Sequence, residues 1–517
     1  MDYQFNNFYE IIAHHGKKRR KKSALLVDDE KISYGDVLNR ADRLAAFLAS
    51  KGIGKGDKVA LFLRNSPEFV YTLFAVSKLG AVIVPVNTFL KEEELDYILQ
   101  DSGAKILVAS TVHEKVVDSS HASSSCAWIL WEGDDVKEKG EQHIAFDKAL
   151  SITSEVQAAP NTLDDCAVII YTSGTTGKPK GAMLSNRNVI SNAESGRRTI
   201  NVKPRDRAIV FLPMFHSFTF SIGVILPLYV GASIVIIKSI TPFSNIFKQI
   251  LTKRVTVFFG IPDVYNALAK AKLPWYFMWF NRLRAFISGA AALQPKTLDA
   301  MAKKFKRATL LEGYGLSEAS PAVCMNTFKK QKAGSVGTAL YGYEMKVVDD
   351  EMNELPRGAI GDIIVKGDNV MIGYHNRPEA TAETIVNGWL LTGDMGYMDD
   401  EGFLFIVDRK KDLIISKGIN IYPRELEEVI DKFEGVKASA VIGIEDEKSG
   451  EIPIVYIELE DGVDTLDEAG LKAYMREHLA NYKIPRQIHV IEELPKNATG
   501  KVLKRVLKEK IKSHNDA

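Results

Sequence analysis

The sequence predicts an α/β protein whose larger part consists of mostly parallel sheets covered by helices, followed by a small β-rich part and an α+β C-terminal part. Three observations support this prediction. Strand-like and helix-like segments alternate up to Lys346. Short strands with many glycines follow, among them Gly358, Gly361, Gly367 and Gly373. Beyond the charged cluster at 408–412, a compact α+β pattern continues to the C-terminus.

The first strands and helices are recognised by their apolar patterns and by the glycines that follow them. Continuous apolar runs at 58–63, 81–86 and 105–108 indicate buried strands. The segments between them, 67–78 and 92–101, are helical, and Gly80 and Gly103 end these helices. The alternation of strands and helices repeats after residue 160, where the apolar run 166–171 leads into a loop rich in Gly, Thr and Ser. Because helical crossovers connect parallel strands, this order favours parallel sheets.

The composition is that of a globular protein and excludes several classes of function. The chain has 517 residues, of which 46% are hydrophobic and 26% charged, so it can bury a large core. Its net charge of +1 gives no overall field that would attract nucleic acid. Cys126, Cys166 and Cys324 lie far apart, which argues against a disulfide framework or a zinc site. This cysteine usage fits a reducing compartment, and we expect a cytoplasmic location.

Two segments bear on membrane contact. The stretch 208–237 has no formally charged residue, but prolines and glycine interrupt it, so we interpret it as loop, buried helix, turn and buried strand. The N-terminus lacks the charged-then-apolar order of a signal peptide. The basic run 17–22 is either a solvated loop or a contact with anionic lipid headgroups at the inner membrane surface.

The strongest local motif is the loop Tyr-Thr-Ser-Gly-Thr-Thr-Gly-Lys-Pro-Lys-Gly at 171–181. Its glycines expose backbone N–H groups, and its hydroxyls and lysines add donors and positive charge, which is what a polyphosphate requires. It is not a Walker A loop, because Thr172 stands where that motif has Gly and Pro179 follows Lys178.

The loop resembles the signature P-loop of the adenylate-forming superfamily, which comprises acyl-CoA synthetases, nonribosomal peptide adenylation domains and luciferases. In that family the loop holds the β- and γ-phosphates of ATP. The resemblance implies phosphate contacts for Thr172, Ser173, Gly174, Thr175, Thr176, Gly177 and Lys180.

The segment 312–318 resembles the second core motif of the same family. An aromatic ring can stack on a base, and a carboxylate can hold Mg²⁺. By resemblance, Tyr314 packs on adenine, Glu318 binds the metal, and Ser317 supplies a hydroxyl where the family usually has Thr. The same nucleotide site is expected to include Gly289, Ala290, Glu312, Gly313 and Gly315, with Gly289 and Ala290 also bordering the acyl group.

Further motifs complete the resemblance and follow the family's order. Asp394, in the run 389–396, would accept hydrogen bonds from both ribose hydroxyls, and Arg409 would also reach the ribose. Lys411 matches the family's hinge. Gly418 matches the entry of the pantetheine arm, and Lys501, near the C-terminus, matches the catalytic lysine.

The resemblance also implies an architecture. It predicts a large N-terminal domain over 1–408 with two mostly parallel sheets and a small β-rich part. A hinge at 409–411 and a small mobile C-terminal domain over 412–517 would follow. Rotation at the hinge would present a different face of the small domain in each half-reaction.

The acid to be activated is indicated by the residues expected near the acyl group. The run 214–220 has no carboxylate, so an amino acid substrate is disfavoured, and His216 is a candidate gate near the reacting carboxylate. Phe258, Gly260 and Ala290 are the other candidate acyl-binding residues. The aromatic run 274–280 is core, pocket wall or a membrane-facing patch, and we expect core or pocket.

These motifs indicate an ATP- and Mg²⁺-dependent acid–thiol ligase. It would convert a medium- or long-chain fatty acid to acyl-AMP, release pyrophosphate and transfer the acyl group to coenzyme A as co-substrate. One alternative is a ligase that loads an alkyl or aryl acid onto a carrier-protein thiol. Another, from a different class, is a non-catalytic nucleotide-binding scaffold. Peripheral membrane contact and a homodimer, which is common among relatives, also remain open.

Overall fold

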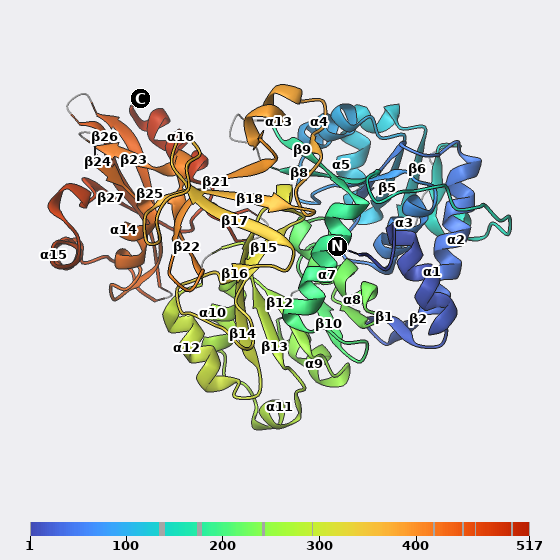
Figure 1. The fold of residues 1–517 in the computed structure, drawn as a ribbon, viewed down its shortest axis with the longest axis horizontal. Coiled ribbons are helices and arrows are strands. Elements are labelled where there is room, and N and C mark those ends of the chain that lie inside the picture. The colour runs from blue at the N-terminus through green and yellow to red at the C-terminus, as the bar shows by residue number, and fades with distance from the viewer. Residues whose placement is uncertain are drawn as a thin grey trace. The chain divides into compact units, whose positions relative to one another are not determined.

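The computed structural model describes residues 2–133, 140–172, 178–239, 243–291, 293–416, 419–446, 449–460, 462–497 and 500–515. The chain is mixed α/β and separates into two compact units (Figure 1). The first unit comprises Met1–Glu344 and Val365–Leu390, and the second comprises Met345–Ile364 and Leu391–Ala517.

A nine-stranded sheet in the first unit has the order β16-β15-β14-β13-β12-β10-β11-β1-β2. The strands from β14 to β1 are parallel, whereas β2, β15 and β16 are antiparallel to their neighbours. Their bounds are β1 Ser23–Val27, β2 Glu30–Ser33, β10 Arg207–Val210, β11 Ser233–Ile236, β12 Val257–Gly260, β13 Ala285–Ser288, β14 Thr309–Gly315, β15 Ala322–Met325 and β16 Thr338–Ala339.

An eight-stranded sheet in the same unit has the order β19-β9-β8-β4-β3-β5-β6-β7. Its strands are β3 Lys58–Phe62, β4 Val82–Pro85, β5 Ile106–Ser110, β6 Trp128–Glu132, β7 His143–Ala145, β8 Cys166–Thr172, β9 Lys180–Ser185 and β19 Gly373–Tyr374. Helices α3 (Pro67–Lys78) and α4 (Glu92–Ser102) lie between the first of them in sequence, as predicted, and Gly80 and Gly103 have left-handed backbone after them. The two mostly parallel sheets are therefore confirmed.

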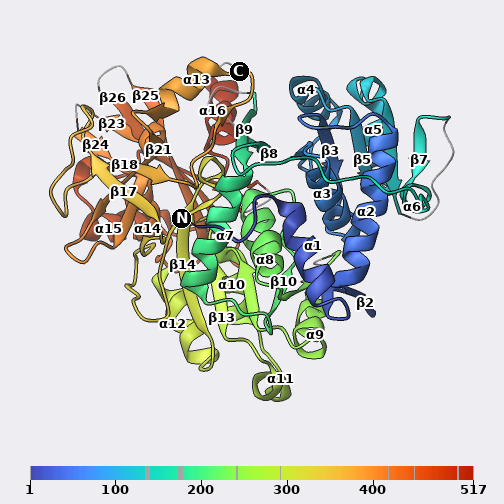
Figure 2. The ribbon, with the colours of Figure 1, turned by 45° about the vertical axis from the view of Figure 1, so that its right-hand side comes forward.

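The helices of the first unit pack around these sheets. α1, α2 and α3 form one group (Figures 1 and 2). Besides α3 and α4, the bounds are α1 Phe8–Lys18, α2 Tyr34–Ser50, α5 Glu114–Ser119, α6 Phe146–Leu150, α7 Asn186–Ile200, α8 Leu226–Tyr229, α9 Ser244–Thr252, α10 Pro262–Lys270, α11 Trp275–Phe280, α12 Pro295–Lys304 and α13 Pro378–Thr384.

The uncharged stretch 208–237 folds as a buried part of the first unit. The predicted helix, turn and strand are a π-helical segment at Thr219–Ile225, then α8 and β11. The stretch begins within strand β10, however, and not with the expected loop, because its apolar residues continue the parallel sheet. No described helix is long and apolar enough to cross a membrane.

Two other expectations need correction. The basic run 17–22 is not simply a loop, since Lys17 and Lys18 end α1 and half-buried Lys22 donates to the carbonyls of Pro204 and Gly231. The aromatic run 274–280 forms α11, and Phe277 alone among its aromatic residues is buried. The other four aromatic side chains are exposed, so the expectation of core is wrong for Trp275, Tyr276, Trp279 and Phe280.

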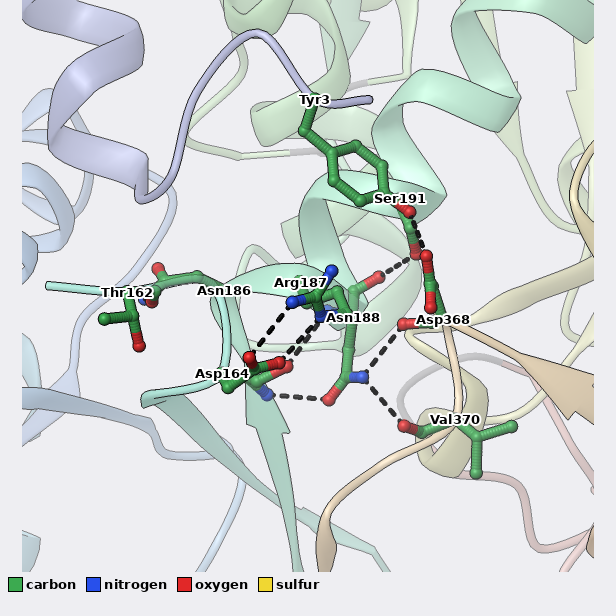
Figure 3. Close-up of polar contacts among 10 residues, drawn as sticks. Tyr3, Thr162, Asp164, Asn186, Arg187, Asn188, Ser191, Asp368 and Val370 are labelled. Carbon is green, nitrogen blue, oxygen red and sulfur yellow. Dashed lines mark hydrogen bonds and ion pairs between the residues drawn. The ribbon is translucent and has the colours of Figure 1, made fainter. Parts of the chain in front are cut away.

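A polar cluster fastens the segment after Asp368 to α7 (Figure 3). The Asn188 side-chain amide donates to the carbonyls of Asp368, at 2.9 Å, and Val370, at 2.8 Å. The Tyr3 hydroxyl donates to the Asp368 carboxylate at 2.5 Å. These contacts fix the chain immediately before β19, which pairs with β9 through Tyr374 and Ala182.

The second unit contains the predicted β-rich and α+β parts. A five-stranded sheet, through which the boundary between the units passes, consists of β17 Tyr343–Val348, β18 Gly361–Gly367, β21 Trp389–Met398, β20 Ile385–Val386 and β22 Leu404–Arg409. The other sheet consists of β24 Ile419–Ile421, β23 Ile414–Ser416, β26 Gly450–Leu459, β25 Val436–Asp446 and β27 Gln487–Ile491. Its helices are α14 Pro423–Ile430, α15 Glu468–His478 and α16 Lys504–Asn515. The hinge at 409–411 stays a prediction.

Candidate active site

The carboxyl ends of β13 and β14 bring two predicted segments together. Ser288, the last residue of β13, pairs with Glu312 in β14. Because β13 and β14 run in the same direction, Gly289 and Ala290 lie beside the last three residues of β14, which begin at Gly313. This edge is where open α/β sheets generally bind ligands.

The end of β14, after Glu312, has little room for side chains. A Cβ atom on Gly315 would lie 1.9 Å from the carbonyl oxygen of Pro321, so only glycine fits there. Buried Glu312 accepts a hydrogen bond from the backbone N–H of Leu293 at 3.0 Å. Its carboxylate therefore fixes the backbone at Leu293.

The loop that contains His216 meets the segment directly after β14. The hydroxyls of Ser217 and Ser317 lie 3.0 Å apart. Burial lowers the pKa of His216 to about 4, so the imidazole is neutral at pH 7. The backbone N–H of Phe218 donates to Nδ1 at 3.3 Å, which leaves the proton on Nε2. His216 can thus offer a neutral N–H donor.

Glu318 and Lys180 are connected through Tyr374, which the sequence analysis did not identify. The Tyr374 hydroxyl donates to Glu318 Oε1 at 2.8 Å, and Lys180 Nζ lies 5.2 Å from the centroid of the Tyr374 ring. Burial, and then the Glu318 charge, raise the pKa of Tyr374 far above its usual value, so it remains a donor. A tyrosine in a two-residue strand gives no sequence signal for such a contact.

The phosphate loop is described only at its ends. β8 and β9 are antiparallel, and Thr172 pairs with Lys180. The Thr172 hydroxyl donates to the Lys180 carbonyl at 3.4 Å. The other predicted loop residues, and Gly418, lie outside the described residues: Ser173, Gly174, Thr175, Thr176 and Gly177.

The predicted acyl-binding residues of β12 belong to the core. Phe258 is fully buried, with its ring centroid 4.9 Å from that of Phe211. A Cβ on Gly260 would meet the Tyr265 ring at 2.9 Å, so this glycine serves helix packing. Phe259, on the opposite face of the strand, has its ring centroid 6.2 Å from that of Phe218. The aromatic side chain of β12 that reaches the His216 loop is therefore Phe259.

The remaining predicted residues lie in the second unit. Asp394 in β21 pairs with Arg409 in β22, and Arg409 Nε lies 3.3 Å from Asp394 Oδ1. Asp394 is buried. A carboxylate has several acceptor sites for hydrogen bonds and no donor.

Lys501 is subject to the charges of the same two residues, Arg409 and Asp394. Burial first, and then the nearby Arg409 charge, lower the pKa of Lys501 to about 8, although Asp394 opposes the shift. The Asn497 side chain accepts the backbone N–H of Lys501 at 3.0 Å and holds it in a turn. Burial also lowers the pKa of Lys411. Lys410 instead binds Asp350 and Asp362, at 2.7 and 2.6 Å.

No group of three or more His, Cys, Asp or Glu side chains suited to a metal ion occurs in the described part of the chain. Glu318 can therefore offer a divalent cation one carboxylate ligand, and a bound polyphosphate and water would have to supply the others.

Comparisons with known proteins support the interpretation of these residues as a nucleotide-binding site. The family model for AMP-binding enzymes matches residues 12–375, and that for the AMP-binding enzyme C-terminal domain matches 425–501. A long-chain-fatty-acid–CoA ligase of Bacillus subtilis is 34% identical, covering 94% of this chain and 91% of its own. An anthranilate CoA ligase solved with anthranoyl-AMP has a TM-score of 0.91 at 28% identity, covering 100% and 99% of the chains. ATP-bound MatB from Rhodopseudomonas palustris has a TM-score of 0.89 at 33% identity, covering 98% and 99%.

The lowered pKa of Lys501 leads to a testable prediction. Competitive acetylation across a pH series, read by mass spectrometry, should label Lys501 with a midpoint near pH 8. An ordinary lysine has a pKa of about 10.4. Arg409→Gln should move the Lys501 midpoint upward, because it removes a neighbouring positive charge. A midpoint near 10 in the unaltered protein would contradict the assigned environment.

Proposed function

Because the chain belongs to the AMP-binding enzyme family, we propose that it is an ATP-dependent ligase that activates a medium- or long-chain fatty acid as acyl-AMP and transfers the acyl group to coenzyme A. The observation that carries this proposal is the contact of Lys180, Tyr374 and Glu318 beside the segment 312–317. This contact brings together a cation, a carboxylate that can bind a metal ion, and the segment that carries an aromatic ring for the base. A site for a nucleoside triphosphate requires these groups.

In the first unit, Thr172 and Lys180 bind the β- and γ-phosphates together with the loop between them. Tyr314 stacks on adenine, while Gly313 and Gly315 let β14 pack closely against the segment 321–325. Glu318 is the proposed Mg²⁺ ligand, and the bound ion would neutralise phosphate charge. Tyr374 is a positioning residue, because its hydroxyl fixes one oxygen of Glu318.

In the second unit, Asp394 accepts the ribose hydroxyls, and Arg409 supports this carboxylate from 3.3 Å. Lys501 donates to the substrate carboxylate and the α-phosphate while they react, which offsets the growing negative charge. The substrate carboxylate attacks the α-phosphorus and pyrophosphate leaves. The coenzyme A thiolate, entering past Gly418, then attacks the acyl carbon and AMP leaves. Movement at Lys411 separates the two half-reactions.

The substrate assignment has several supports. The His216 loop has no carboxylate for an ammonium group, and Phe218 and Phe259 supply apolar walls near Gly289. The Bacillus subtilis relative acts on long-chain fatty acids. The anthranilate ligase is the observation that favours a second candidate, an aryl acid. Coenzyme A is the proposed acceptor, and a carrier-protein thiol is the alternative. We also propose a cytoplasmic location.

A substrate panel tests the proposal. We expect pyrophosphate and AMP from Mg·ATP, coenzyme A and C8–C18 fatty acids, with less from benzoate-type acids and none from amino acids. Products would be measured by a coupled pyrophosphate assay and by mass spectrometry of the acyl-CoA. Pyrophosphate without acyl-CoA would point to a carrier protein. No pyrophosphate with any acid would reject the ligase and favour a nucleotide-binding scaffold.

Lys501→Ala should separate the half-reactions. Adenylation should fall by about a hundredfold or more, the cost of removing one preorganised charge-stabilising donor. Transfer from chemically supplied acyl-AMP to coenzyme A should stay within about twofold of normal. Stopped-time assays of both steps check this, with Lys432→Ala, an exposed lysine of the same unit, as control. Equal loss in both steps would reject this role of Lys501.

Tyr374→Phe should weaken Mg²⁺ binding at Glu318 without unfolding the site. A hydrogen bond to a charged group contributes about 1.5–3 kcal/mol, so the apparent dissociation constant for Mg²⁺ should rise about tenfold or more. kcat at saturating Mg²⁺ should change little. Tyr97→Phe is a matched control, since Tyr97 donates to the Pro179 carbonyl and not to Glu318. An unchanged Mg²⁺ constant would show that Tyr374 does not position the carboxylate.

A further inference from the structure

Helix α11 exposes its aromatic side chains to an unusual degree. Trp275, Trp279 and Phe280 are 72%, 74% and 69% exposed, and Tyr276 is 47% exposed. Phe277 anchors the helix in the core, where its ring centroid lies 5.4 Å from that of Phe247, and partly buried Met278 packs against the same core. Two exposed tryptophans on one six-residue helix are a large apolar area for a water-facing surface. α11 lies at the lower end of both views (Figures 1 and 2).

This helix lies at the sheet edge opposite the candidate site. α11 precedes β13 in the chain, whereas Gly289 and Ala290 follow that strand. The chain enters β13 through Arg282 and enters β14 through Lys306 and Arg307, and these three basic residues are exposed. Because β13 and β14 are parallel, the basic residues share the amino edge of the sheet with α11.

The charge of this region differs from that of the whole chain. Between Asp206 and Glu312 there are fourteen Lys and Arg residues and two carboxylates, Asp263 and Asp299. Asp263 begins α10, just after the carboxyl end of β12, and is therefore away from the amino edge. Asp206 does lie at the amino edge, but it is buried and paired with Arg284 at 2.7 Å. The net charge of the protein is only +1, so this positive excess is local.

A cavity of about 370 Å³ adjoins α11, with a lining that includes Met278, Trp279, Lys306 and Arg307. Arg307 donates to the carbonyls of Met278 and Trp279 and so fixes the end of the helix. The aromatic and basic groups are thereby held side by side. Tryptophan and basic residues at adjacent positions match the two layers of a membrane interface, apolar chains and anionic headgroups.

We propose that α11 and the basic residues Arg282, Lys306 and Arg307 form a docking surface for an anionic membrane. The tryptophans enter the interface between headgroups and acyl chains, while the basic side chains contact the lipid phosphates. A six-residue helix is far too short to span a bilayer, so the contact is peripheral. Docking at the amino edge leaves the carboxyl edge, with the candidate site, free. The surface does not depend on which acid is activated.

Vesicle co-sedimentation of the full chain tests this surface. We expect binding to vesicles of 70% phosphatidylcholine and 30% phosphatidylglycerol, with at least tenfold weaker binding to pure phosphatidylcholine or in 1 M NaCl. Trp275→Ser with Trp279→Ser should lower the partition coefficient at least tenfold, as should Arg282→Glu with Lys306→Glu. Tyr482→Ser with Lys432→Glu, which removes an exposed aromatic and an exposed cation elsewhere, should bind normally.

Each contrary outcome has a definite reading. The proposal is overturned if the tryptophan double variant and the charge-reversal double variant both bind vesicles as the unaltered protein does and unfold at the same temperature. It is also overturned if the unaltered chain self-associates without lipid and the tryptophan variant is monomeric by sedimentation velocity, since a second copy would then cover α11. Pyrophosphate release by the same samples without vesicles reports the proposed ligase activity separately, so failure of docking and failure of that activity are distinguishable.

Discussion

The parallel register of β12, β13 and β14 is the constraint on which the first unit's candidate site depends. Because Gly260 and Ser288 end their strands and Glu312 is followed by the last three residues of β14, the segments after all three meet at one edge of the sheet. Close packing at that edge requires glycine at Gly315, where a Cβ atom would lie 1.9 Å from the carbonyl oxygen of Pro321. The pairing of the Ser217 and Ser317 hydroxyls adds the loop after β10 to the same edge.

Much of this arrangement could be predicted from local sequence. Apolar runs bounded by glycine located β3, β4, β5 and β8, because strand burial and helix termination are local properties. The motif around Glu318 was found for a similar reason, since its residues are adjacent in sequence. The start of 208–237 was misjudged, because a short apolar segment has no periodicity that separates a strand from a loop.

Contacts between distant segments could not be predicted in the same way. Tyr374 reaches Glu318 only because β19 pairs with β9, a pairing that local sequence does not encode. Phe258 and Phe259 are adjacent and chemically identical. Only the orientation of β12 in the sheet determines that Phe258 packs in the core and Phe259 contacts the His216 loop. Likewise, the aromatic content of α11 suggests a core helix, and its exposure follows from its place at the end of the sheet.

The chain passes from one unit to the other three times, at 344–345, 364–365 and 390–391. Neither unit is therefore a continuous stretch of sequence. A genetic fragment that starts after the predicted hinge would lack β17, β18, β21 and β22, and any single crossover within the chain between two related genes would divide at least one of the units. Exchange of the second unit between homologues by recombination thus requires several coordinated breakpoints, so the two units are expected to be inherited together.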